Sequence, residues 1–363
     1  MSKSKGTVLV AMSGGVDSSV AAALLKKRGY NVIGMMMKIW QDSEAESQHG
    51  GCCSLEAWGD VRRVARQIDI PCHIVDFREQ FMESVVADFV SEYRKGRTPN
   101  PCVRCNQYLK FKDLMKKADE LGCDYLATGH YARIRFNHRT NRWNLWQSLS
   151  DKKDQSYALS MLDQYQLSRA KFPIGELSSK DETRKLAAEM GLPVARKADS
   201  QEFCFAEQAG DYIQLIKNIA PEVFVEGPIL DTSGKEIGRH EGIALYTVGQ
   251  RRRIRLNRDG QPLYVISIDS INNAVIVGSN EELNRCEANV SSVCWGAIDN
   301  LKNPLEVQAK IRYNMHVSPA TLLPTGDELR VTVKFKNPVR AISPGQTAVF
   351  YQGQSVVGGG IID

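Results

Sequence analysis

The stretch Ser13–Ser19 reads SGGVDSS. It follows the short apolar run Thr7–Met12 (TVLVAM) and leads into the apolar-rich stretch Val16–Arg28. This order predicts a strand, a glycine-rich turn and the N-terminus of a helix. Backbone N–H groups converge in such a turn and the positive end of the helix dipole adds to them, which predicts a phosphate site. The plainer interpretation is a serine-capped helix after a glycine turn, and the complete pattern favours the phosphate site.

The same turn indicates how a chain of phosphates would be held. It lacks the G-x-x-x-x-G-K-[ST] pattern, so it brings no lysine to a γ-phosphate. Asp17 lies inside the turn instead, where a carboxylate is suited to hold Mg²⁺ against a pyrophosphate group.

Size and composition narrow the class of protein. The chain has 363 residues and a mass of 40.5 kDa, which predicts two or three domains. It has no apolar run as long as a membrane span, and the run before Ser13 is too short for a signal peptide. We therefore expect a cytoplasmic protein without a membrane partner. The net charge of +5 permits a nucleic-acid partner without requiring one.

The first two hundred residues alternate strand and helix signals. Repeated units of this kind predict a doubly wound parallel sheet with helices on both faces. Ligands of such sheets bind beyond the C-terminal ends of the strands, where SGGVDSS, Met37 and Gly129 are expected to meet. The predicted strands are 7–12, 31–38, 72–77 and 125–128, and the predicted helices are 16–28, 54–68, 79–94 and 111–121.

The composition and the hydrophobic pattern of the sequence change near Ala206, where glycine, proline and short alternating segments begin to dominate. Short antiparallel strands, and hence small β-rich domains, are expected there. The predicted division is an N-terminal α/β domain at 1–206, a central small β-rich domain at 207–278 and a C-terminal β-barrel-like domain at 279–363. The predicted strands of this half are 263–268, 274–277, 329–335 and 348–351.

The cysteines are nine in number, in a chain without an export signal. Catalytic or cluster-binding thiols are therefore a better interpretation than a structural disulfide framework. Cys102 and Cys105 form a CxxC within RTPNPCVRCN, and its prolines predict a loop. Half of a zinc ribbon, a redox pair and a structural pair remain open for it. Cys204 lies in the polar segment KADSQEFCF, and no role is assigned to Cys52 and Cys53.

Two further segments bear on a nucleic-acid partner. Gln250–Arg258 (QRRRIRLNR) holds five arginines, and both a phosphate-contacting surface and a solvated basic loop remain open for it. Trp143 and Trp146 alternate with polar residues as in a hairpin. They are expected to pack rather than to stack on bases.

The heptapeptide at Ser13 resembles the pyrophosphate loop of ATP pyrophosphatases. The chain as a whole resembles the tRNA-specific 2-thiouridylases, bacterial enzymes that thiolate the wobble uridine (position 34) of tRNA. The resemblance spans nearly the whole chain and rests on motifs in a fixed order. They are SGGVDSS, NPCVRCN at 100–106, KDQSY at 153–157, DSQEFCF at 199–205, YTVGQRR at 246–252, KIRY at 310–313 and SPGQTAVFY at 343–351.

This resemblance implies roles for single residues. It implies that Cys105 is the nucleophile and Cys204 the persulfide carrier, and that the two end in a disulfide. The residues implied to bind ATP are Ala11, Met12, Ser13, Gly14, Gly15, Val16, Asp17, Ser18, Met37 and Gly129. The residues implied to contact tRNA are His130, Lys153, Asp154, Gln155, Arg312, Tyr313 and Gln346.

The sequence departs from the family's motifs in two places. Cys102 stands where an aspartate is usual, and Arg253 and Arg255 stand in GQRRRIRL where a glycine and a small residue are common. The extra thiol opens a second route for sulfur. Cys102, Cys105 and Cys204 would then ligate three irons of a [4Fe–4S] cluster, with hydrosulfide at the fourth. Persulfide and cluster stay alternatives at this point.

The activity implied is an ATP-dependent, AMP-forming tRNA-uridine 2-sulfurtransferase, with ATP and Mg²⁺ as cofactors. Its partners would be tRNA and a sulfur donor, either a cysteine desulfurase, a relay protein or free sulfide. Two other functions stay open. One is a different ATP pyrophosphatase-type ligase or tRNA-modifying enzyme, and the other is a non-catalytic RNA-binding sulfur carrier.

Overall fold

The structure is a computed structural model, and it describes residues 4–40, 55–198, 212–254, 257–258 and 260–363. Cys204, Cys52 and Cys53 lie outside the described residues. The chain forms two compact units that are each discontinuous in sequence. The first comprises Met1–Val85, Cys102–Gly210 and Gln354–Val356, and the second comprises Val86–Pro101, Asp211–Gly353 and Val357–Asp363.

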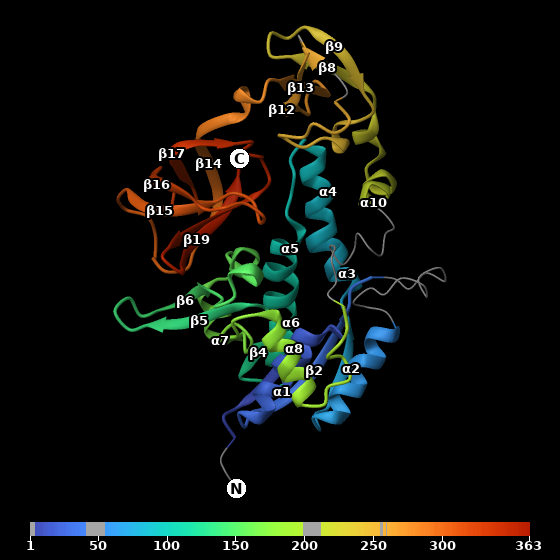
Figure 1. Ribbon diagram of the computed structural model, residues 1–363, viewed down its shortest axis with the longest axis vertical. Helices are drawn as coiled ribbons and strands as arrows, with labels where there is room; N and C mark the ends of the chain where they lie inside the picture. Colours follow the sequence, from blue (N-terminus) through green and yellow to red (C-terminus); the bar gives the residue numbers. More distant parts are fainter. Residues whose placement is uncertain (1–3, 41–54, 199–211, 255–256, 259) are drawn as a thin grey trace. The chain divides into compact units, whose positions relative to one another are not determined.

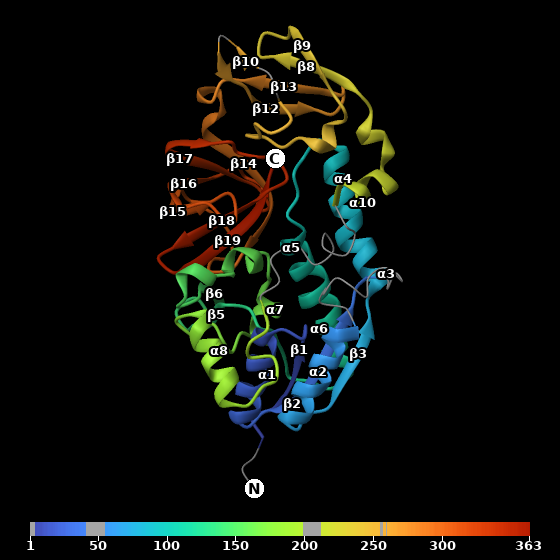
Figure 2. The same cartoon turned by 45° about the vertical axis from the view of Figure 1, so that its right-hand side comes forward.

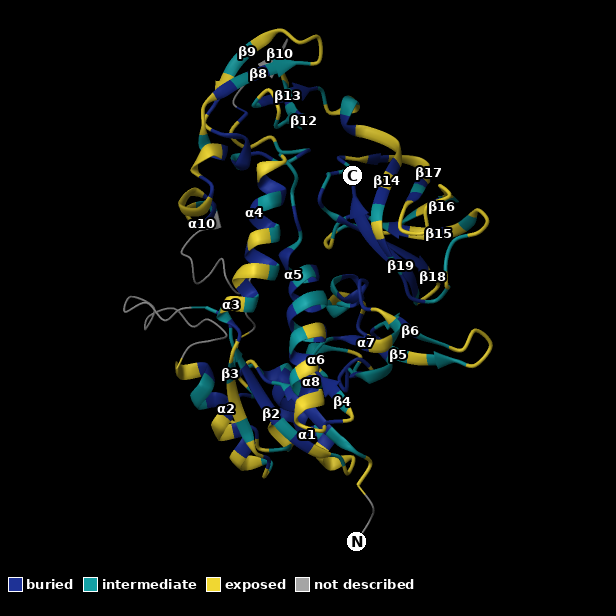
Figure 3. Ribbon diagram, turned by 180° about the vertical axis from the view of Figure 1, so that it is seen from behind, coloured by how far each residue is buried: buried dark blue, intermediate teal, exposed yellow. Residues whose placement is uncertain are grey.

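A five-stranded sheet in the order β3-β2-β1-β4-β7 forms the centre of the first unit (Figure 1). Every pairing in it is parallel, which confirms the predicted α/β fold class. Strand β1 has three consecutive fully buried residues, Val8 to Val10, as expected of a strand covered on both faces. Its neighbour β2 is also largely buried (Figure 3). The strands are β1 (Thr7–Ala11), β2 (Asn31–Lys38), β3 (Cys72–Asp76), β4 (Tyr125–Ala127) and β7 (Ala170–Lys171).

Helices cover this sheet. Small residues at 21–23 of α1 let that helix lie close to β1 and β2, and α2 packs on β2 and β3 (Figure 2). Both helices share one apolar core with α8, through residues such as Val20, Val61 and Ala187. The helices of this unit are α1 (Val16–Lys27), α2 (Leu55–Gln67), α3 (Arg78–Phe81), α5 (Pro101–Arg104), α6 (Leu114–Glu120), α7 (Gln164–Arg169) and α8 (Lys180–Glu189).

The prediction that the CxxC lies on a loop is wrong. Helix α5 begins at Pro101, and a π-helical stretch, Cys105–Asp113, continues it into α6. Proline is well placed at the first helical position, because the N–H group that it lacks would have no intrahelical acceptor there. Pro101 therefore starts the helix and does not exclude it, and Cys105 lies within a packed element.

A β-hairpin, β5 (Ala132–Asn137) and β6 (Arg142–Gln147), completes the first unit and confirms the predicted hairpin at Trp143 and Trp146. Both tryptophans are partly buried, and the Arg135 guanidinium lies 4.8 Å from the ring centre of Trp146. Ser355 pairs with Trp146, which is why the short segment Gln354–Val356 belongs to this unit.

The second unit contains a small sheet in the order β12-β13-β8-β9, and the helices α4 (Ala87–Arg94) and α10 (Tyr212–Ile219). The expectation of antiparallel strands alone is wrong here, because β13 and β8 pair in parallel. The strands are β8 (Gly227–Asp231), β9 (Glu236–His240), β12 (Tyr264–Asp269) and β13 (Ala274–Gly278), with a separate short pair, β10 (Asn257–Arg258) and β11 (Gln261–Pro262).

The remaining strands of the second unit form a closed barrel. Its order is β14-β17-β16-β15-β18-β19, and a pairing between β14 and β19 closes it. Phe335 and Phe350 lie in its apolar core. The strands are β14 (Asn284–Trp295), β15 (Leu305–Lys310), β16 (Ser318–Pro324), β17 (Val331–Arg340), β18 (Thr347–Gln352) and β19 (Ser355–Ile362).

Among the described residues, no helix is both long enough and apolar enough to span a membrane.

Candidate functional site

The turn between β1 and α1 has the geometry of an anion site. Gly14 has φ +72°, and a Cβ there would lie 2.7 Å from the carbonyl oxygen of Ala57, so glycine is required. Gly15 is the N-cap of α1, and no side chain caps it. The hydroxyls of Ser18 and Ser19 instead donate to the Gly15 carbonyl. The serine-capped alternative is therefore wrong, and the first N–H groups of α1 have no intrahelical acceptor.

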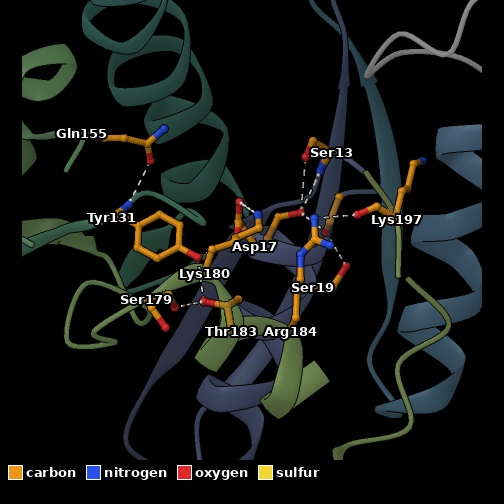
Figure 4. A network of polar contacts seen from close by, with 12 residues as sticks. Ser13, Asp17, Ser19, Tyr131, Gln155, Ser179, Lys180, Thr183, Arg184 and Lys197 are labelled. Atoms are coloured by element: carbon orange, nitrogen blue, oxygen red, sulfur yellow. Dashed lines mark hydrogen bonds and ion pairs between the residues drawn. The ribbon is translucent and has the colours of Figure 1, made fainter. Parts of the chain in front are cut away.

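Asp17 joins two side chains from distant parts of the sequence (Figure 4). Its Oδ1 accepts a hydrogen bond from the Tyr131 hydroxyl at 3.0 Å, and its Oδ2 pairs with the Lys180 ammonium at 2.7 Å. The Tyr131 hydroxyl lies 2.6 Å from the hydroxyl of buried Thr183 in α8. A carboxylate, an ammonium and a phenol therefore face the N-terminus of α1.

Lys180 was missed by the sequence analysis. It is the first residue of α8, after the N-cap Ser179, and its side chain is 13% exposed. A cation at a helix N-terminus is unfavourable, because the helix dipole is positive there. That mismatch was the signal available in the sequence, since serine followed by acidic residues at 179–182 marks a helix start.

The loops after β1 and β4 meet, as predicted. A Cβ on Gly129 would lie 2.5 Å from the backbone nitrogen of Ser18, so only glycine allows this approach. Met37 lies at the same edge of the sheet, because Met35 of β2 pairs with Ala11 at the end of β1 and Met37 follows two residues later. The structure therefore brings the turn, Gly129 and Met37 to one edge.

His130 lies beside this edge in an apolar setting. Its ring faces Phe111 and Phe172, and its Nδ1 is 2.6 Å from the hydroxyl of Thr128. Burial, and secondarily the charge of Lys110, hold the pKa of His130 well below its usual range. The imidazole is therefore neutral at neutral pH, and it is suited to hydrogen bonding rather than to charge pairing with a phosphate.

Cys105 is buried at the start of the π-helical stretch, and Cys102 is partly buried one turn earlier. The neighbouring Asn106 is 2% exposed, donates through Nδ2 to the carbonyl of Ala158, and accepts from the Lys110 ammonium. The π-helix is rare and is frequently found at functional sites.

The KDQSY segment is hydrogen-bonded to Tyr131, whose hydroxyl donates to Asp17 of the phosphate turn. The side-chain carbonyl of Gln155 accepts from the backbone N–H of Tyr131 at 3.0 Å, and the backbone N–H of Gln155 donates to the Tyr131 carbonyl. Asp154 accepts from the backbone N–H and the hydroxyl of Ser156. Both residues implied to contact tRNA thus hold the segment in place, and Lys153 lies beside them with its side chain partly exposed.

Arg312 and Tyr313, two neighbouring residues of the second unit that are implied to contact tRNA, differ in their surroundings. Arg312 donates to the carbonyls of Val248 and Ala341 and to the hydroxyl of Ser343, whereas Tyr313 is 42% exposed.

Gln346 is hydrogen-bonded to the backbone just before the CxxC. Its Nε2 donates to the carbonyl of Thr98 at 2.9 Å. The Thr98 N–H donates to the carbonyl of Pro344, and the Arg97 guanidinium donates to the carbonyl of Ile362. The barrel therefore holds the segment Arg97–Thr98 through both backbone and side-chain bonds.

Among the residues that the structure describes, no three His, Cys, Asp or Glu side chains gather as a metal site would require. The predicted cluster includes Cys204, which lies outside those residues.

Three family models match the chain. Residues 6–208 match a model described as "tRNA methyl transferase HUP domain", residues 214–279 one described as "tRNA methyl transferase PRC-barrel domain", and residues 285–362 one described as "Aminomethyltransferase beta-barrel domain". A relative named "tRNA-specific 2-thiouridylase MnmA" from Clostridioides difficile (strain 630) is 48% identical, over 98% of each chain. The chain belongs to the family of tRNA-specific 2-thiouridylases.

Other members of the family are similarly related. The relative from Natranaerobius thermophilus is 46% identical over 98% of this chain and 96% of its own, and that from Symbiobacterium thermophilum is 48% identical over 98% and 92%. Among solved structures, a 4-thiouridine synthetase–RNA complex with bound ATP is 18% identical, with a TM-score of 0.36 over 60% of this chain and 51% of that one. A TM-score this low carries nothing about the site.

Proposed function

We propose that this chain is an ATP-dependent tRNA 2-thiouridylase that replaces the C2 oxygen of the wobble uridine (position 34) by sulfur, through an adenylated uracil. The observation that carries the proposal is the glycine-lined N-terminus of α1, where Asp17, Lys180 and Gly129 converge. Membership of the 2-thiouridylase family supports the choice of substrate. The division into domains at 1–206, 207–278 and 279–363 is part of the proposal.

Adenylation comes first, because the C2 carbonyl is a poor electrophile and oxide is a poor leaving group. The uracil oxygen attacks the α-phosphorus of ATP, and the bond to the β-phosphate breaks, so pyrophosphate leaves. Negative charge grows on the departing pyrophosphate. The N–H groups at the start of α1 are fixed in place to stabilise it, which is the main way in which such sites lower a barrier.

The site also suits Mg²⁺. Asp17 offers one carboxylate that is 33% exposed, and Mg²⁺ typically takes one or two carboxylates together with substrate phosphates and water. Asp17 would hold the ion, which neutralises phosphate charge when bound. Lys180 already places one positive charge 2.7 Å from that carboxylate, and the Tyr131 hydroxyl fixes the other oxygen.

Sulfur transfer follows at the thiols. In the persulfide route, the terminal sulfur on Cys204 attacks C2, and AMP leaves with the former C2 oxygen. The Cys105 thiolate then attacks the Cys204 sulfur and breaks the S–S bond. 2-Thiouridine is released, and a Cys105–Cys204 disulfide remains for an external thiol to reduce. The Cys204 persulfide receives its sulfur from a donor protein that already carries a persulfide, such as a cysteine desulfurase or a relay protein, whereas free sulfide serves the cluster route.

The cluster route uses Cys102 as well. Cys102 and Cys105 lie three residues apart on one helical segment and offer soft thiolates, the donor type that an iron–sulfur cluster requires. Cys204 would be the third ligand. When bound, a cluster with one open iron supplies a site for hydrosulfide.

A reconstituted assay tests the function. Purified protein, ATP, Mg²⁺, unmodified tRNA and a reducing thiol are incubated with sulfide in one reaction and with a persulfide-bearing cysteine desulfurase in another, and AMP and 2-thiouridine are measured separately. Formation of both products supports the proposal. AMP without thiouridine would indicate another ATP pyrophosphatase chemistry, and tRNA binding without AMP would indicate a non-catalytic carrier.

A cysteine panel separates the two sulfur routes. In the persulfide route, the Cys105→Ser and Cys204→Ser proteins should each lose thiolation but still form AMP. The Cys102→Ser protein should remain substantially active in thiolation. In the cluster route, anaerobically purified protein should contain roughly four irons per chain, and Cys102→Ser should lose both the iron and thiolation. Cys123→Ser is the matched control, since Cys123 is buried beside β4 and has no part in either route.

A further inference from the structure

The arginine run of the second unit contains a strained backbone. Arg253 has φ +73°, in the left-handed region that favours glycine. The N–H of Ile254 donates to the carbonyl of Arg251 at 3.1 Å, so residues 251–254 form a four-residue turn with Arg253 in third place. Turns with a positive φ at that place normally use glycine or asparagine. An arginine there lowers stability relative to glycine, and such strain is often found at functional sites.

Buried side chains and hydrogen bonds hold this turn in place. Ile254 is 2% exposed, and the Gln250 carboxamide donates to the carbonyls of Leu245 and Arg252. The backbones of Gln250 and Gly249 each exchange a hydrogen bond with Val265 of β12. The turn is therefore built to hold its shape, so φ +73° at Arg253 is set by the surrounding structure.

The turn presents positive charge outward. Arg251, Arg252 and Arg253 are all exposed, and among the described residues none of them makes an ion pair within 4.0 Å. By contrast, Arg239 in β9 of the small sheet pairs with Glu226 and Glu236. Three adjacent cations without a described acidic partner leave their charge available to a polyanion.

Two more arginines donate hydrogen bonds to the loop that leads into this turn. The Arg312 guanidinium donates to the carbonyl of Val248, and Arg340 donates to that of Gly249. The loop that leads into the turn is thus held by basic side chains, and one of them, Arg312, belongs to the residues implied to contact tRNA. The basic turn and that implied contact are parts of one structure.

We propose that the turn Arg251–Arg253 contacts the phosphate backbone of the RNA substrate, and that Arg253 occupies a glycine position because its charge is needed there. This inference rests on the proposed function. A peptide or protein partner is not favoured, because three adjacent arginines offer charge and no apolar anchor.

Four variants of Arg253 separate charge from strain. Arg253→Gly removes both, Arg253→Ala removes the charge alone, and Arg253→Lys keeps both. Arg253→Asn removes the charge and places a residue that tolerates a positive φ. Lys235→Ala, in the exposed turn between β8 and β9, is the matched control for losing one cation.

The readouts are the melting temperature and the affinity for unmodified tRNA at several salt concentrations. Each lost phosphate contact should weaken binding about fivefold near 0.15 M salt, and should lower the log–log salt slope by about 0.7–0.9. We therefore expect weaker binding for Gly, Ala and Asn and near wild-type binding for Lys. The melting temperature should rise for Gly, change less for Asn, and stay at or below wild type for Ala.

The outcomes are distinct. An Arg253→Gly protein with a raised melting temperature and an unchanged salt slope would overturn the RNA contact. A lowered melting temperature for Gly would overturn the claim of strain. If wild-type protein binds no tRNA at any salt concentration, the proposed function fails and not merely this contact.

Discussion

Gly14 and Arg253 have nearly the same φ, +72° and +73°, in two turns that share little else. At Gly14 the backbone of Ala57 lies where a Cβ would be, so no other residue fits. At Arg253 the side chain is exposed to solvent, so the same backbone angle costs strain without a clash. A positive φ therefore excludes larger residues only where space is also lacking. Elsewhere a side chain can occupy the position if its chemistry is needed.

The strongest way to break this comparison is Gly14→Ala. The new Cβ would meet the Ala57 carbonyl oxygen at 2.7 Å, so the turn must shift, and the N–H groups of α1 shift with it. We expect AMP formation to fall at least a hundredfold and the free energy of unfolding to fall by about 2–4 kcal/mol. Arg253→Ala, at the same φ, should leave the rate of AMP formation at saturating tRNA unchanged. Equal loss in both variants would refute the comparison.

Asp17→Ala tests the polar side of the phosphate turn. We expect AMP formation to fall about a hundredfold or more, because the carboxylate that orders Lys180 and Tyr131 is lost. Stability should fall only by about 1–2 kcal/mol, since Asp17 is 33% exposed and water can partly solvate Lys180.

The double variant Asp17→Ala with Lys180→Ala is its control. It should regain stability, because no unpaired ammonium remains, but it should not regain AMP formation. AMP release at the wild-type rate from Asp17→Ala would remove the nucleotide role from this turn.

Charge reversal in the arginine turn should have a smaller effect on a different readout. For Arg251→Glu with Arg252→Glu, we expect tRNA affinity to fall about thirtyfold near 0.15 M salt, and the log–log salt slope to drop by about 1.4–1.8. Affinity for ATP should not change. Filter binding over a salt series checks this prediction, and an unchanged slope would leave the segment as a solvated basic loop.

The smallest expected effect is a dependence of stability on pH at His130. Burial lowers the pKa of His130 in the folded state, so below about pH 6.5 the unfolded chain binds a proton that the folded chain does not. The free energy of unfolding should therefore fall as the pH falls through that value. His130→Gln should show a shallower fall between pH 7 and 5, measured by urea unfolding at each pH. A steeper fall would contradict the lowered pKa.

The sequence predicted the strand–turn–helix unit and the meeting of Gly129 with the phosphate turn, because both follow from local pattern and from the rule for parallel sheets. It failed at Pro101, which has the sequence signature of a helix breaker and the position of a helix start. The π-helical stretch at Cys105 has no periodic signature that a 3.6-residue pattern would detect.

Lys180 could not have been placed beside Asp17 from sequence. The two are 163 residues apart, and only the folded sheet brings them together. The positive φ of Arg253 was hidden for the opposite reason. The family's usual glycine marked the position, but an arginine gives no local sign of a left-handed backbone.

The hydrogen bonds between the barrel and Thr98 can form only late in the synthesis of the chain. Thr98 is translated 248 residues before Gln346, its hydrogen-bond partner, a delay on the order of 10–50 s at typical elongation rates. Helix α4 and the segment after it therefore leave the ribosome long before the strands that hold them exist. Strand β19 is made later still, and its Ile362 accepts from Arg97. The segment that leads into the CxxC can thus be fully held only after β19 has been made, so a chain that stops before Ile362 lacks these bonds.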